Sequence, residues 1–187
     1  DDFGIYNVVG GVVVLFSFLT NAMTSSTQRF LNYNFGLKNE SKVSHIFNVS
    51  ILTHFTIFLL VLLLSETVGL WFVMTQLNIP VGRETATMWV YQMSVVTTLI
   101  GIMVIPYRAS IIAAERMSIF AYVSILEVAL KLVVVLVLSY MSFDNLVMYS
   151  ILLTLVAMLN FFIYQIECRR KLSFTKYHFV WDKSQYK

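Results

Sequence analysis

Two opposite charges lie inside an otherwise apolar stretch. Glu127 and Lys131 are the only charged residues between 118 and 141. They are four residues apart, so on an α-helix they share one face and can form an ion pair. A charge at the centre of a membrane helix costs roughly 2.5–3.5 kcal/mol, so the pair should face a bundle interior or a wet cavity. We expect it either to fix helix register or to sense a substrate or coupling ion, with Ser124 extending the same face.

A second set of polar and small residues recurs at helical spacing in the first apolar segment. Gly and Ser in such a stripe typically let membrane helices pack closely. Asn21, Gln28 and Arg29 are equally suited to lining a cavity. The planar guanidinium of Arg29 can bind phosphate oxygens through two hydrogen bonds, but it is equally suited to being a positive anchor at the membrane surface. The whole stripe comprises Asn7, Gly10, Gly11, Ser17, Asn21, Thr24, Ser25 and Gln28, followed by Arg29.

Other polar residues are interpreted as structural. His54 lies within the second apolar segment and is expected to be a hydrogen-bonded core histidine. Arg108, Glu115 and Arg116 are expected to form a solvated cluster at the inner membrane surface. The sequence has no HExxH, Gly-rich phosphate loop, paired CxxC or nucleophile elbow. Its single cysteine cannot form a metal site alone. We therefore expect no enzyme activity, no cofactor and no metal site.

Composition places these residues in a membrane protein. The 187 residues are 58% hydrophobic and only 12% charged, against about 25% charged in soluble proteins. A membrane helix needs about 20 apolar residues. The sequence predicts an all-α polytopic membrane bundle of five transmembrane helices, at about 5–36, 41–73, 83–113, 117–141 and 145–171. Residues 1–171 would form the bundle, as part of a larger transporter lobe, and 172–187 a cytoplasmic linker or tail.

The distribution of Lys and Arg predicts the orientation. Eleven of the thirteen lie in three connecting regions on one side, at 29–42, at 108–116 and in the tail from 169 to 187. Cytoplasmic loops carry such an excess of positive charge. We therefore expect an external (periplasmic) start and a cytoplasmic tail. Pro106, near the inner end of the third predicted span, should kink its helix. Because the chain opens with Asp-Asp rather than Met, we expect an internal piece of a longer protein.

Four strings carry a resemblance to a known family. They are DFGIYNVVGGV at 2–12, STQRFLN at 26–32, SETVGLW at 65–71 and IPYRASIIAAERMS at 105–118. In this order and spacing they resemble the polysaccharide-transporter (Wzx-type) flippases of the multidrug/oligosaccharidyl-lipid/polysaccharide exporter superfamily. The chain departs from the pattern at Arg108, where Asn is expected after Pro-Tyr, which leaves a ligand role there in doubt.

The resemblance implies an alternating-access carrier of two pseudo-symmetric lobes. This chain would supply most of the N-terminal lobe, without that lobe's first helix and without the second lobe. Such proteins move undecaprenyl-pyrophosphate-linked sugar repeats across the bacterial inner membrane. The implied partners are this lipid-linked oligosaccharide, membrane lipids, the missing lobe and a coupling ion, H⁺ or Na⁺, with no nucleic acid. Arg29 and Lys131 would contribute to a cationic cavity.

Two other functions stay open at this point. A multidrug or cation antiporter of the same superfamily would need an acidic pocket, which Glu127 beside Lys131 suits poorly. A non-transporting membrane scaffold would use the polar stripes only to pack helices.

Overall fold

The computed structural model describes residues 23–37, 40–77, 79–140 and 144–175, and every regular element in these ranges is helical. Gly36, Pro80 and Gly82 lie at or near breaks between apolar segments, where helices commonly end. The elements are a helix over residues 23–36, α2 (Glu40–Leu64), the π-helical turn η1 (Ser65–Gly69), α3 (Leu70–Thr75), α4 (Glu84–Ala113), α5 (Met117–Leu138), α6 (Asn145–Lys171) and the 3₁₀ turn η2 (Ser173–Thr175).

Four of the described helical segments are long and apolar enough to cross a membrane. They are Ser41–Thr75, Glu84–Ala113, Met117–Leu138 and Asn145–Lys171. The chain is therefore a multi-pass membrane protein by helix length and hydropathy. The last four predicted spans are confirmed, although the first of them continues to Thr75 and the helix expected to reach 141 ends at Leu138. The first predicted span, 5–36, lies mostly outside the described residues.

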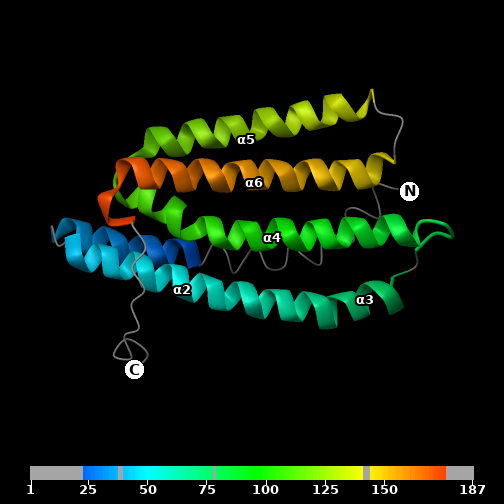
Figure 1. Ribbon diagram of the computed structural model, residues 1–187, viewed down its shortest axis with the longest axis horizontal. Coiled ribbons are helices and arrows are strands. Elements are labelled where there is room, and N and C mark those ends of the chain that lie inside the picture. Colours follow the sequence, from blue (N-terminus) through cyan, green and yellow to red (C-terminus); the bar gives the residue numbers. More distant parts are fainter. Residues whose placement is uncertain (1–22, 38–39, 78, 141–143, 176–187) are drawn as a thin grey trace.

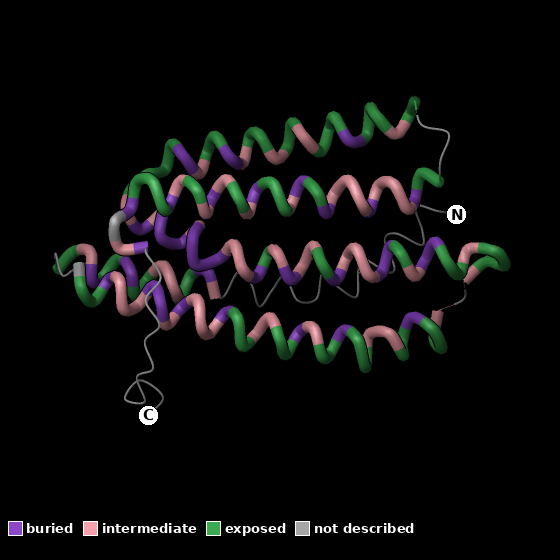
Figure 2. The backbone as a smooth tube through the Cα atoms, in the orientation of Figure 1, coloured by how far each residue is buried: buried purple, intermediate pink, exposed green. Residues whose placement is uncertain are grey.

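The long helices lie side by side in the order α2, α4, α6, α5 (Figure 1). α4 packs mainly against α6 and α2, whereas α5 packs mainly against α6. α4 and α6 each have a neighbouring helix on both sides, and α4 has the most buried residues of the long helices (Figure 2). α5 has three buried residues, Ile119, Val123 and Val134, and most of its surface is left open by the described helices.

The two ends of the bundle are held by different contacts. At the predicted outer end, Arg83 forms an ion pair with Asp144, which also caps α6 by accepting from the Leu146 backbone N–H at 3.1 Å. At the inner end, Phe174 of η2 packs edge-on against Phe35, with ring centroids 5.0 Å apart. The first residues of the predicted 172–187 tail thus pack on the bundle, and 176–187 lie outside the described residues.

A π-helical turn interrupts the second span where α4 contacts it. The Tyr91 hydroxyl donates to the Ser65 carbonyl at 2.6 Å, and Tyr91 is 1% exposed. The Ser65 carbonyl thus accepts from a side chain, whereas in a regular helix it would accept only from a backbone N–H. Gly69, at the end of the turn, lies against Tyr91 so closely that an added Cβ would overlap the hydroxyl oxygen. Glycine is therefore required by the tyrosine, not by backbone angles.

We predict that Gly69→Ala lowers the free energy of unfolding by about 1–2 kcal/mol, because overpacking exceeds the helix-propensity gain of alanine. The same substitution should cost less in a Tyr91→Phe background, where the overlapping oxygen is gone. Denaturant unfolding in detergent micelles measures both. Gly101→Ala is the matched control, since a Cβ there meets nothing within 4 Å; equal effects at the two glycines would contradict the prediction.

Candidate functional site

The predicted ion pair forms on α5. Lys131 Nζ donates to Glu127 Oε1 at 2.6 Å. The side chains are 52% and 38% exposed, respectively, so the described helices do not enclose the pair as the sequence led us to expect. The difference arises because α5 is the outer helix of the row, and covers little of its surface with α6. The pair lies on a surface that the described part of the chain leaves open.

A buried tyrosine of α6 connects this pair to an arginine of α4. Tyr164 lies near Ser124 of α5 and within electrostatic range of Glu127 and Arg108. Ser124 is one turn before Glu127, so the same side of α5 supplies both contacts. The structure thus brings Ser124, Glu127 and Lys131 together, as the sequence predicted. With Arg108 and Tyr164 they form what we call the polar seam.

Arg108 corrects one interpretation of the sequence. It does not join Glu115 and Arg116, which are exposed at the α4–α5 connection. Instead, its guanidinium is half-buried and donates to Thr24 Oγ1 at 3.4 Å. The physical reason is that α4 continues through Pro106 to Ala113, so Arg108 lies within the helix and projects toward neighbouring helices. The uncharged run from 109 to 114 is the sequence signal for this position.

The other predicted site residues lie elsewhere. Arg29 is exposed and Gln28 half-buried on the 23–36 helix, outside the polar seam, and Asn21 lies outside the described residues. Sequence reasoning missed Tyr164 and also Asn160, which is buried one turn before it and whose Oδ1 has no hydrogen-bond partner among the described residues. Their spacing of four on an apolar helix is the signal that could have found them.

The charges of the seam favour an anion. Arg108 and Lys131 are cations and Glu127 is a carboxylate, so these three side chains together carry one excess positive charge. An arginine can bind phosphate oxygens through two hydrogen bonds, and a lysine acts as a point charge beside it. In the described ranges, no group of three His, Cys, Asp or Glu could hold a metal ion. The seam therefore has the chemistry of anion binding.

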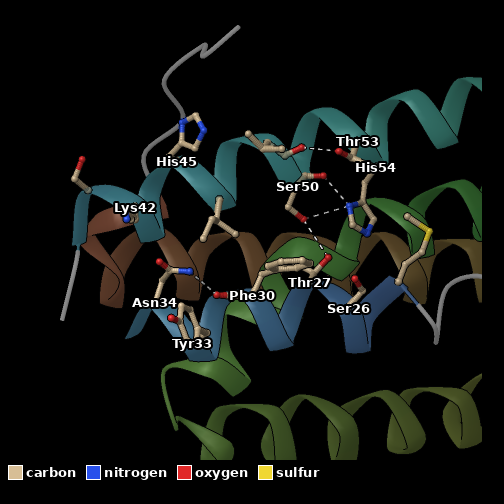
Figure 3. A pocket seen from close by; sticks show the side chains of 14 residues that line it. Ser26, Thr27, Phe30, Tyr33, Asn34, Lys42, His45, Ser50, Thr53 and His54 are labelled. Atoms are coloured by element: carbon tan, nitrogen blue, oxygen red, sulfur yellow. Dashed lines mark hydrogen bonds between the residues drawn. The ribbon is translucent and has the colours of Figure 1, made fainter. Parts of the chain in front are cut away.

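A second polar region lies between the 23–36 helix and α2. It is a cavity of about 970 Å³ with His54 among its lining residues (Figure 3). His54 Nδ1 lies 2.7 Å from the Ser50 carbonyl, which confirms the expected hydrogen-bonded histidine. Lys42 and His45 also line the cavity, toward the predicted cytoplasmic end.

We predict that the Glu127–Lys131 pair is coupled by more than about 1 kcal/mol, because a membrane-level pair is poorly screened, whereas exposed i,i+4 pairs reach about 0.3–0.5 kcal/mol. A double-mutant cycle with Glu127→Gln and Lys131→Met, measured by unfolding at low and high salt, gives this energy. Glu167–Lys171, a pair of the same spacing 3.1 Å apart at the inner end of α6, is the control. Equal, salt-sensitive coupling in both pairs would refute the membrane location.

Comparison of the chain with protein-family models, with curated proteins and with solved structures finds no match. The resemblance noted from the sequence therefore stays a prediction.

Proposed function

We propose that this chain is part of a transporter that exports a phosphate-bearing, lipid-linked oligosaccharide across the bacterial inner membrane by alternating access. The observation that carries the proposal is the polar seam. Lys131 and Glu127 lie on a surface of α5 that the described helices leave open, and Arg108 lies half-buried on α4; both helices are of membrane length. The predicted substrate is an undecaprenyl-pyrophosphate-linked sugar repeat.

The open position of the seam supports a transport role over a purely structural one. A pair that only fixed helix register would be expected between packed helices, where no lipid reaches it. Lys131 is instead half exposed. Contact with acyl chains would be costly for a charged side chain, whereas contact with a water-filled cavity would not. A central cavity, closed on its other side by a second lobe, would satisfy this requirement.

The seam also suggests how a pyrophosphate would be held and released. Lys131 has one partner in the described structure, Glu127. A ligand phosphate would compete with this carboxylate for the ammonium group, while Arg108 could add a bidentate contact. The phosphate would therefore bind strongly only while the Glu127 carboxylate is not paired with Lys131. Such competition would give the site two states, which alternating access requires.

The same geometry disfavours the multidrug or cation antiporter. A cation site needs a carboxylate whose charge is available, and Glu127 is already paired at 2.6 Å. The excess charge of the seam is positive, so organic cations would be repelled. A scaffold protein would need no charged open surface at all.

The test is translocation of a fluorescent lipid-linked oligosaccharide by the full-length protein in proteoliposomes. Lys131→Met and Arg108→Met should each slow translocation about 10- to 100-fold, because each removes a charge-assisted interaction of about 1.5–3 kcal/mol. Lys171→Met, which removes a positive charge at the inner end of α6, should leave the rate unchanged.

Undiminished translocation in both seam variants would remove the seam from the mechanism. Transport of a cationic dye, but not of the lipid-linked sugar, would favour the antiporter. Movement of neither compound by the unmodified protein would favour the scaffold.

A further inference from the structure

The cavity between the 23–36 helix and α2 extends from the polar end of α2 into its membrane-spanning part. On α2 its lining begins at Ser41 and ends at His54. This distance is about 20 Å along a helix with a 1.5 Å rise per residue. The cavity thus joins the predicted cytoplasmic surface to the interior of a candidate span, Ser41–Thr75.

Hydroxyl groups line the inner part of this cavity. Ser26 and Thr27 come from the 23–36 helix, and Ser50 and Thr53 from α2. Ser50 Oγ donates to Thr27 Oγ1 at 3.4 Å, across the two helices. The charged and titratable groups that line the cavity are Lys42, His45, His54 and Tyr33, and no carboxylate lines it among the described residues. Volume and lining together suit water.

His54 presents an unpaired acceptor at the inner end. Its Nδ1 lies 2.7 Å from the Ser50 carbonyl oxygen, which can only accept, so Nδ1 carries the hydrogen. In the neutral ring, Nε2 is then a bare lone pair. His54 is 1% exposed, and Nε2 has no hydrogen-bond partner among the described residues. A buried acceptor left in this state costs about 1–3 kcal/mol, which a donor in the cavity would remove.

We propose that water fills this cavity from the Lys42 end and that His54 Nε2 binds a proton delivered through it. A hydronium ion gives its proton to the Nε2 lone pair and leaves a water molecule, and the Nδ1–H bond to Ser50 stays in place. On the neighbouring helix α4, the titratable groups facing α2 and the 23–36 helix are Tyr91, which is bonded to Ser65, Tyr107, whose ring contacts Phe47, and Arg108, which is bonded to Thr24. None of these side chains is a carboxylate, the kind of group that would compete with Nε2 for the proton.

This proton site deepens the proposed function, because it would name H⁺ as the ion coupled to transport. Only that use of the proton rests on the proposed function. Hydration of the cavity and protonation of His54 are properties of the chain itself, and both can be measured without any transport.

Thiol accessibility tests the water. In a Cys168→Ser background, Thr53→Cys should react with a charged, membrane-impermeant methanethiosulfonate within about tenfold of the rate of Ser41→Cys at the mouth, since these reagents need a hydrated thiolate. Phe55→Cys is the matched control, because Phe55 lies at the same depth, outside the cavity lining and 47% exposed. Its reaction should be slower by about 100-fold or more. Equal rates at 53 and 55 would overturn the hydrated cavity.

Carbethoxylation by diethylpyrocarbonate tests the proton, because the reagent attacks only a neutral imidazole nitrogen. Peptide mapping by mass spectrometry separates His54 from His45 and His178. The rate at His54 should fall along a single titration curve as pH decreases within about pH 8 to pH 5. A rate that does not change with pH, or an absent reaction, would overturn proton binding. Ser50→Ala should retain the titration, because the Nδ1 bond is to the backbone carbonyl.

The two proposals fail separately. A titrating, water-accessible His54 in a protein that moves no lipid-linked sugar would leave the proton site standing and refute the transport proposal. Translocation that persists while His54 is unreactive would leave the transport proposal standing and refute the proton site.

Discussion

The requirement that polar groups inside a membrane find partners within the protein governs this structure. Many hydroxyls of the long helices meet it locally, by donating to the carbonyl four residues earlier, as Thr53 does to Val49 and Thr97 to Met93. Other hydrogen bonds join two helices. The Tyr91–Ser65 bond reshapes α2 into a π-helical turn, and Thr97 and Thr154 lie 2.9 Å apart between α4 and α6.

Against this background, the polar groups that are incompletely satisfied are the informative ones. Among the described residues they include the exposed Glu127–Lys131 pair of α5, Nε2 of His54 and Oδ1 of Asn160. Glu127, Lys131 and His54 belong to none of the hydrophobic core clusters among the described residues. A stable bundle does not need either arrangement, because an apolar residue at each position would pack without an electrostatic cost. Function is the more economical explanation for keeping them.

Much of the fold follows from the sequence, and the candidate site follows in part. Apolar runs of about 20 residues located the last four spans, and the i,i+4 spacing located the Glu127–Lys131 pair. Hydropathy could not show that α5 lies at the edge of the row, because lipid and protein demand similar apolar surfaces. Nor could it show the partners of Arg108, since Thr24 and Tyr164 are distant in sequence and meet only through helix packing.

The 23–36 helix contacts both the polar seam and the surroundings of His54. Thr24 accepts from Arg108 of the polar seam, and Thr27 accepts from Ser50, whose carbonyl oxygen lies against His54 Nδ1. The two threonines are three residues apart, so they lie on neighbouring parts of one helix face. A shift of this helix would therefore alter the surroundings of Arg108 and of His54 together. If an anion binds at the seam and a proton at His54, this helix is the physical element through which one event would change the free energy of the other.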